Sequence, residues 1–178
     1  MKVIVGAGGT ELPGWVSLDQ SELDITQPAQ WARLFKPGSL SMILAEHVWE
    51  HLTFDQGLMA ALNCYSYLKP RGNLRIAVPD GYHSDRRYVR WVAPGIGYNG
   101  DDHKVLYNYH SLSRLLTSVG FNVNCKEWFD ERRRLHTLPM DYERGYVKRY
   151  SRSFWANVLS LFLGFQYTSL VIDAVKPR

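Results

Sequence analysis

Short apolar runs alternate with stretches of helical spacing along this chain. The apolar runs predict strands, because they hold branched or aromatic residues and end at turn-forming or polar residues. These six runs are residues 2–5, 16–19, 41–45, 74–78, 121–128 and 169–176. The section between the last two runs, rich in arginine and aromatic residues, is not assigned to an element.

Two helices are predicted from apolar residues that recur on one face. The first follows a capping-box pair, Thr53 and Gln56, and is expected to stop at a KPRG turn, residues 69–72. The second is predicted to have Ser111 as its cap and to end at Gly120. Strands that alternate with helices predict an α/β fold with a largely parallel sheet.

Ligands of such a sheet bind at the carboxyl ends of its strands. The residues directly after the predicted strands are therefore the first candidates for a site. They are Gly6 to Gly9, Asp19, Glu46, His47 and the segment from Asp80 to His83.

Composition narrows the class of protein. The 178 residues fit one domain, residues 1–178. Two cysteines are too few for a disulfide scaffold, and no charged-then-apolar leader begins the sequence, so we expect a cytoplasmic protein with reduced thiols. The longest apolar stretch, residues 154–165, is too short to span a membrane.

Positive charge gathers in residues 126–152, which carry eight of the 21 lysines and arginines against five acids in a chain of net charge +4. A surface for nucleic acid or for an anionic membrane is one interpretation. A solvated basic face is the favoured interpretation, because no RNA- or DNA-reading motif accompanies the charge. Nucleic acid is therefore not an expected partner.

The loop after the first strand, GAGGTELPGW, predicts close approach of the backbone to a ligand. A dinucleotide site needs G-x-G-x-x-G and a helix that points at a pyrophosphate. Glu11 takes the place of the third glycine, and the Pro13-Gly14 pair leaves almost no room for that helix. S-adenosylmethionine has no phosphate, so the loop suits that cofactor better.

Acids after the second strand fit the same cofactor. Asp19 is positioned to accept both ribose hydroxyls, and Asp24, followed by apolar Ile25, is positioned to contact adenine. A glycine turn with a capping aspartate explains the same residues equally well without a cofactor.

The middle of the chain carries a longer signature. Residues 41–80, SMILAEHVWEHLTFDQGLMAALNCYSYLKPRGNLRIAVPD, contain an EHxxEHL segment and an LKPGG-type turn, and they resemble the core of class I S-adenosylmethionine-dependent methyltransferases. VGAGGTELPGWVSLD, residues 109–121 and YTSLVIDAVK are similar to other parts of that family. The similarity is thinnest in residues 82–108 and 126–165.

This resemblance implies a Rossmann-like, mostly parallel sheet of seven strands with an antiparallel last strand, and a cofactor across the ends of strands 1, 2 and 4. By position it assigns Gly6, Ala7 and Gly8 to the methionine portion, Asp19 to the ribose, Asp24 with Ile25 to the adenine, and Glu46 with His47 to the surroundings of the sulfonium. Only ten residues, 6–15, join the first two strands, fewer than the dozen or so of a usual parallel crossover. We therefore expect a reduced connecting helix and an open pocket.

Two further motifs raise the question of a metal. HVWEH, residues 47–51, matches the inverted zinc-protease signature, but a strand before it and the capping box after it leave no helix to present both imidazoles. A polar pair, Glu50 and His51, that fixes the loop is favoured, and no metal is predicted. The DDH run, residues 101–103, is interpreted as a turn and cap, although the resemblance places His103 over the cleft.

Methyl transfer from a sulfonium depends mostly on alignment, and it needs a base only where the acceptor loses a proton. The unranked candidates for a base are His47, Asp80, His83 and His103. Four tyrosines are candidates either to line an acceptor pocket or simply to pack in the fold: Tyr82, Tyr98, Tyr107 and Tyr109. The sequence thus predicts an enzyme that methylates a small molecule. The alternative is a degenerate module of the same fold that docks an anionic partner through residues 126–152. The oligomeric state is left open.

Overall fold

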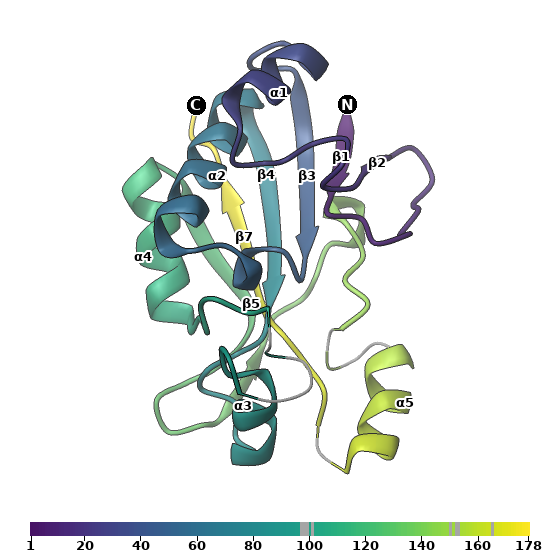
Figure 1. Cartoon of the computed structure of the whole chain (residues 1–178), viewed down its shortest axis with the longest axis vertical. Helices are drawn as coiled ribbons and strands as arrows, with labels where there is room; N and C mark the ends of the chain where they lie inside the picture. The colour runs from purple at the N-terminus through teal and green to yellow at the C-terminus, as the bar shows by residue number, and fades with distance from the viewer. Residues whose placement is uncertain (97–99, 101, 150, 152–153, 165) are drawn as a thin grey trace.

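The computed structural model of the chain describes all residues except 97–99, 101, 150, 152–153 and 165, so Tyr98 and Asp101 lie outside the described residues (Figure 1). The elements follow in the order β1 (Lys2–Val5), β2 (Val16–Leu18), α1 (Pro28–Leu34), β3 (Leu40–Glu46), the 3-10 helix η1 (Trp49–His51), α2 (Phe54–Tyr67), β4 (Leu68–Val78), α3 (Arg86–Val92), α4 (Tyr109–Val119), β5 (Asn122–Phe129), β6 (Leu135–Thr137), the 3-10 helix η2 (Tyr142–Arg144), α5 (Phe154–Leu163) and β7 (Leu170–Val175).

The described strands form one seven-stranded sheet of order β2-β1-β3-β4-β7-β5-β6. Strands β2, β1, β3 and β4 are parallel neighbours, and β7 runs antiparallel between β4 and β5. This arrangement confirms the predicted α/β sheet with an antiparallel last strand. One feature was not predicted: the short strand β6 also pairs antiparallel, with β5, at the sheet edge.

The helix α2 confirms the predicted capping box, because Thr53 Oγ1 accepts from the Gln56 amide and Gln56 Oε1 accepts from the Thr53 amide. Helix α2 ends at Tyr67, directly before the KPRG segment at which it was expected to stop, but that segment belongs to β4 and is not a separate turn. Leu68 already pairs with Leu40, so β4 starts where α2 ends, and residues 69–72 form an irregularity within the strand.

The predicted cap of the later helix was also wrong. Asn108, not Ser111, caps α4. The Asn108 side chain accepts from the Ser111 amide at 2.9 Å, and Ser111 Oγ accepts from the Asn108 amide at 3.0 Å. Ser111 therefore fills the third helical position of a reciprocal capping box. Gly120 ends the helix in the left-handed conformation, as predicted.

The connection between β1 and β2 contains no helix, where a reduced helix was predicted, because ten residues that include Pro13 and Gly14 leave no room for one. A helix that was not predicted, α1, follows β2 instead. Pro28 is at its start, where a missing amide hydrogen costs nothing, and the fully buried Trp31 stacks on Tyr67 with ring centroids 5.3 Å apart. This contact holds α1 against α2.

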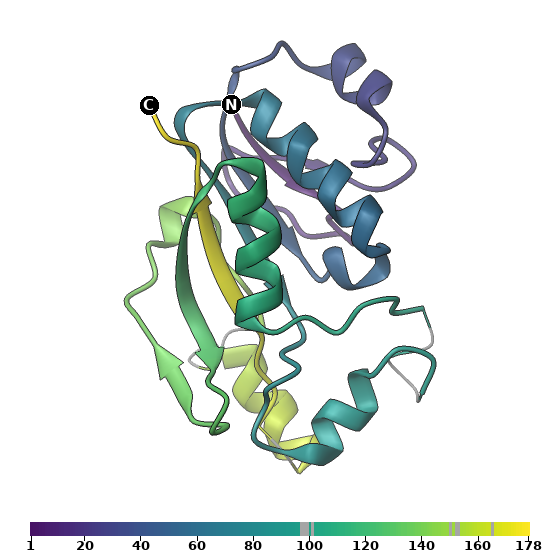
Figure 2. The ribbon, with the colours of Figure 1, turned by 90° about the vertical axis from the view of Figure 1, so that its left-hand side faces the viewer.

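Helices cover one face of the sheet. Figure 2 shows α2 and α4 lying across that face. The large apolar core sits between them, with Ile43 and Ile76 from the sheet and Leu116 from α4 among its buried members. Side chains of neighbouring residues alternate between the two faces of a strand, so each core strand also presents residues to the opposite face.

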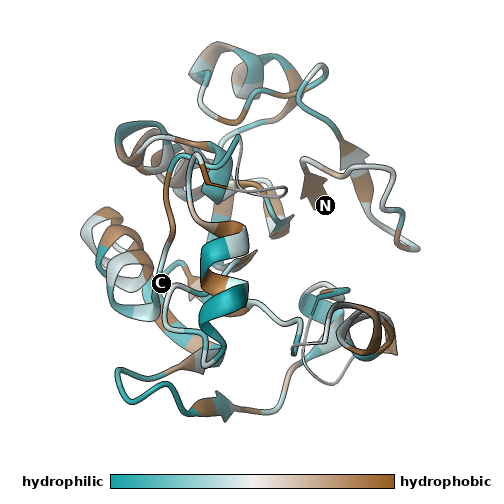
Figure 3. Ribbon diagram, turned by 60° about the horizontal axis from the view of Figure 1, so that its bottom comes forward, coloured by the Kyte–Doolittle hydropathy of each residue, from teal (hydrophilic) through white to brown (hydrophobic). Residues whose placement is uncertain are grey.

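The opposite face is covered mainly by irregular chain. A small second core lies there, made of Ile4, Ala7, Leu44, Ala77, Val147 and Val171. In Figure 3 the arginine-rich turn between β5 and β6 is hydrophilic, whereas α5 carries apolar residues. None of the helices in the described part of the chain has the length and apolar character that a membrane crossing requires.

Candidate functional site

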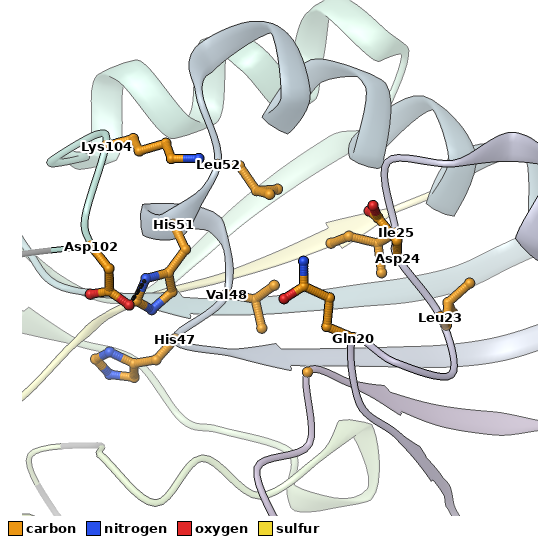
Figure 4. A pocket seen from close by; sticks show the side chains of 11 residues that line it. Gln20, Leu23, Asp24, Ile25, His47, Val48, His51, Leu52, Asp102 and Lys104 are labelled. Carbon is orange, nitrogen blue, oxygen red and sulfur yellow. Dashed lines mark ion pairs between the residues drawn. The ribbon is translucent and has the colours of Figure 1, made fainter.

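Three cavities meet beyond the carboxyl ends of β1 and β3, where parallel sheets bind ligands. The first, of about 420 Å³, extends toward residues 20–25 and is drawn in Figure 4. The second, of about 360 Å³, lies over the glycine loop, and the third, of about 220 Å³, lies beside Pro79 and His103. His47 and His51 border all three, so these two residues mark the junction of the site.

Two glycines of the first loop adopt the left-handed backbone conformation that favours glycine. Gly6 has φ +58°, and a Cβ there would lie 2.6 Å from Val48 Cγ2, so the backbone of β1 approaches the segment after β3 too closely for a side chain. Gly8 has φ +51°, but a Cβ there would meet no described atom within 4 Å. The loop is thus open toward the second cavity, which Gly6, Ala7 and Gly8 all border.

Asp19 lies next to this loop. Its Oδ1 accepts from the Gly8 amide at 2.7 Å, and its side chain is exposed. Asp19 borders none of the three cavities, whereas its neighbour Gln20 lines the first. The carboxylate therefore links the ends of β1 and β2 across the rim of the site.

Asp24 and Ile25 form the far wall of the first cavity (Figure 4). Asp24 Oδ1 accepts from both the amide and the hydroxyl of Thr26, at 2.9 and 2.7 Å. The Ile25 carbonyl accepts from Trp31 Nε1 and Asn63 Nδ2, so helices α1 and α2 fix this wall.

His47 is held in a strained backbone conformation directly after β3. Its φ is +57°, in a region that costs a non-glycine residue of order 1–3 kcal/mol. Nδ1 lies 2.7 Å from Glu50 Oε1, and Nε2 lies 3.0 Å from Ser169 Oγ. Burial acts to raise the pKa of Glu50, but the attraction and hydrogen bond of His47 outweigh it and leave that pKa below its ordinary value.

Glu46 has a structural partner that the sequence did not reveal. Its two carboxylate oxygens accept from the amides of Lys148 and Arg149, at 3.0 and 2.8 Å. Lys148 Nζ also reaches Thr10 Oγ1 at 3.0 Å. The second cavity is therefore closed on one side by two cationic residues that lie a hundred positions away along the chain.

The candidates Asp80 and His83 are buried and border none of the three cavities. Asp80 accepts from the amides of Tyr82 and Phe129, both at 2.8 Å. Burial raises the pKa of Asp80 to about 6 against these hydrogen bonds, and burial lowers the pKa of His83. His83 Nδ1 accepts from the Asp85 amide at 3.0 Å.

His103 is buried and borders the third cavity. Its Nδ1 lies 2.8 Å from the Val92 carbonyl, and its ring meets that of His51 edge to face, with centroids 4.9 Å apart. Asp102 Oδ2 lies 3.0 Å from His51 Nδ1. Asp102 and His103 thus reach the HVWEH segment, although residues 49–51 form a 3-10 helix rather than a zinc-protease helix.

Of the tyrosines proposed to line an acceptor pocket, Tyr107 is buried, and burial raises its pKa to about 12. Tyr82 and Tyr109 pack against each other away from the three cavities, with ring centroids 6.3 Å apart. A hydrogen bond to Glu131 raises the pKa of Tyr109 to about 12. The tyrosine that borders a cavity is instead Tyr167.

The basic segment 126–152 makes many contacts within the chain. Arg133 donates to the His83 carbonyl at 2.6 Å, and Arg134 pairs with Asp130. Arg144 pairs with Asp141, and Arg149 lies over the ring of Tyr167. These four arginines therefore have partners within the chain.

Sequence reasoning missed several residues that border the site. They are Thr10, Gln20, Leu23, Val48, Leu52, Lys104, Lys148, Arg149 and Tyr167. Gln20 and Val48 had a usable signal, because each follows a predicted strand end. Lys148 and Arg149 had none, since only the chain path brings them to Glu46.

No protein-family model matches the sequence, and no curated protein matches it. Solved structures do match. A methyltransferase from Archaeoglobus fulgidus that depends on S-adenosylmethionine is 14% identical with a TM-score of 0.59, over 98% of this chain and 85% of the other. A methyltransferase of Thermotoga maritima, also dependent on S-adenosylmethionine, is 15% identical with a TM-score of 0.59, over 98% and 81%.

Phosphoethanolamine N-methyltransferase 2 of Haemonchus contortus, in complex with S-adenosyl-L-methionine, is 14% identical with a TM-score of 0.55, over 99% of this chain and 48% of the other. At these identities the comparisons establish the fold. The strand order and these matches together give the chain the Rossmann-like fold of class I S-adenosylmethionine-dependent methyltransferases.

Proposed function

We propose that the chain binds S-adenosylmethionine and transfers its methyl group to a small-molecule acceptor. The observation that carries this proposal is the open glycine loop, which borders the second cavity and whose Gly8 amide donates to the Asp19 carboxylate. Gly8 leaves room where a side chain would stand, and Asp19 lies one strand away on the same rim. A cofactor whose adenosine is joined to its amino-acid tail by a sulfonium, with no phosphate, suits a loop that has no helix behind it.

The first two cavities are suited to hold different parts of one cofactor molecule. They share Gly6, and each falls in the size range of small-molecule sites. In this proposal Asp24 and Ile25 contact the adenine, and Asp19 accepts from the ribose. Gly6, Ala7 and Gly8 back the methionine portion in the second cavity.

Charge in the second cavity supports the same orientation. Lys148 and Arg149 are cations on its wall, and the amino-acid tail of the cofactor carries a carboxylate. The Glu46 carboxylate is already bonded to two amides, so it holds these cations in place beside His47. His47 then lies between the cofactor cavities and the third cavity, where we place the acceptor.

The bound cofactor supplies a methyl group on a sulfonium, and the chain supplies alignment. Among the four candidates for a base, His47 and His103 border a cavity, and His47 borders all three. Glu50 lies 2.7 Å from His47 Nδ1, an arrangement that orients an imidazole for proton transfer. We therefore assign His47 as the base for an acceptor that must lose a proton.

Calorimetry of the full chain with S-adenosylmethionine tests the proposal. We expect micromolar binding that Asp19→Ala weakens by about 10- to 100-fold, because hydrogen bonds to a charged group contribute about 1.5–3 kcal/mol. Asp19→Asn keeps an acceptor for the Gly8 amide, so it separates loss of charge from distortion of the loop. Asp55→Ala, in the exposed first turn of α2, is the matched control and should bind normally.

Absence of binding to the unmodified chain would refute the proposal. Unchanged affinity in both Asp19 variants would refute the assigned cofactor position.

A further inference from the structure

A cluster of metal-ligating side chains lies at the junction of the cavities. Glu50, His51 and His103 each offer one donor atom, and these atoms all lie within 4.8 Å of one another. We propose that they bind a divalent transition cation of the zinc class. The cluster combines residues of η1 with the segment that contains His103. Backbone hydrogen bonds hold the two together, since the amides of Lys104 and Val105 both donate to the Glu50 carbonyl, at 2.7 and 3.2 Å.

Glu50 provides the strongest reason to expect a cation. Its side chain is fully buried, and Oε1 lies 2.7 Å from His47 Nδ1. The other oxygen, Oε2, has no hydrogen-bond partner among the described residues. A buried carboxylate oxygen without a partner is unfavourable, and a bound cation removes that cost.

The His103 imidazole is oriented as a metal ligand usually is, and His51 has a carboxylate beside its ring. His103 Nδ1 lies 2.8 Å from the Val92 carbonyl, and His51 Nδ1 lies 3.0 Å from Asp102 Oδ2. In His103, the carbonyl acceptor at Nδ1 fixes the proton there and leaves Nε2 with a free lone pair. A carbonyl or carboxylate behind a histidine is the common outer partner of a metal-bound imidazole.

The donor set selects the class of metal. Two imidazoles and one carboxylate suit zinc and similar first-row ions, whereas magnesium and calcium prefer oxygen ligands. Zinc bonds of roughly 2.1 Å place tetrahedral ligands about 3.4 Å apart. The three donor atoms, all within 4.8 Å of one another, therefore have to move closer together to bind an ion.

The fourth position of such an ion faces the third cavity, which Glu50, His51 and His103 all border. Arg149 lies on the same wall, where its guanidinium is 5.8 Å from the centre of the Tyr167 ring. Water or an anionic oxygen is therefore the expected fourth ligand. If the proposed function holds, this ligand is the acceptor atom, but binding of the ion does not depend on that function.

A simpler interpretation leaves Glu50 paired only with a protonated His47. That interpretation accounts for one oxygen of Glu50. It does not account for Oε2, or for His103 within reach of the same carboxylate. The metal explains all three donors together.

Titration of the chelator-treated full chain, without a histidine tag, tests the site. We expect one cobalt ion per chain with the visible absorption of a tetrahedral complex, displaced by zinc. Glu50→Gln and His103→Asn should weaken binding by at least about 100-fold, and Asp102→Ala by about 10-fold as an outer partner. His110→Asn is the matched control, because His110 is exposed and pairs with Glu131. It should leave affinity unchanged.

His51→Asn serves if the Glu50 variant does not fold, because the His51 side chain is partly exposed. Absence of stoichiometric binding at micromolar zinc would overturn the proposal, as would unchanged binding in the His51 and His103 variants. Cofactor calorimetry on the same metal-free samples separates the two proposals. Metal binding without cofactor binding would support the metal site and refute the methyltransferase function. Cofactor binding without metal binding would refute the metal site alone.

Discussion

The two faces of the sheet are held in different ways. On the face under α2 and α4, the core is apolar and continuous, and regular helices bury it. On the opposite face, the apolar core is small, and a buried ion pair lies in the sheet beside it. Arg75 and Asp173 are direct neighbours across β4 and β7, with Arg75 Nε 2.7 Å from Asp173 Oδ1.

This ion pair fixes irregular chain to the sheet. Arg75 Nη1 donates to the carbonyls of Asp141 and Gly145, at 2.8 and 2.6 Å. A few residues further on, Glu46 binds the amides of Lys148 and Arg149. Apolar burial thus positions helices, whereas directed polar contacts position the loop that brings two cations to the site. Polar contacts are suited to this role because they specify individual backbone groups.

The largest expected effect comes from breaking the ion pair. Arg75→Ala leaves Asp173 buried without its partner, so we expect the free energy of unfolding to fall by about 3–5 kcal/mol in urea denaturation. The double variant Arg75→Met with Asp173→Leu should recover much of that stability, because it removes both buried charges. Residues 139–149 should still exchange amide hydrogens faster. A loss of only about 0–1 kcal/mol from Arg75→Ala, as for an exposed pair, would contradict this account.

A substitution in the core under α2 and α4 should lower the stability of the whole fold without loosening residues 139–149 in particular. Leu116→Ala in α4 removes a fully buried side chain, so we expect a loss of about 3 kcal/mol in the same denaturation assay. The amide exchange of residues 139–149 should become faster only by as much as the loss of global stability accounts for. Selective loosening of that segment would mean that the two faces are coupled more closely than their separate cores indicate.

The smallest effect on stability should come from Glu46→Gln. The amide can accept only through one oxygen, so we expect a global loss of less than about 1 kcal/mol but about 10-fold faster exchange at the Lys148 or Arg149 amide. Hydrogen exchange followed by mass spectrometry measures this, with residues 112–116 as the internal reference. Equal exchange in both proteins would show that Glu46 does not hold the segment.

Sequence patterns were reliable where contacts are local. The Thr53 capping box, the end of α4 at Gly120 and the strand at residues 74–78 each depend on near neighbours. The predicted start of a helix was wrong where two nearby residues could both serve as its cap. Asn108 and Ser111 are both capping residues, and either was a reasonable start of α4 until their reciprocal bonds decided it.

The candidate site was predictable only in part. Gly6, Ala7, Gly8 and His47 follow predicted strands and do lie at the cavities. Asp80 follows one equally well, yet the amides of Tyr82 and Phe129 occupy its carboxylate. A position after a strand places a residue at the correct edge of the sheet, but its side-chain partners decide whether it faces a cavity.

By itself, the sequence determined six of the strands, helices α2 and α4, the glycine loop and the class of sheet, because periodicity and turn chemistry act over a few residues. Only the tertiary structure decided that Glu46 holds Lys148 and Arg149, that Asp173 pairs with Arg75, and that His103 reaches Glu50 and His51. Those pairs are separated by tens to a hundred residues. Their contacts follow from how the layers pack, which no local pattern encodes.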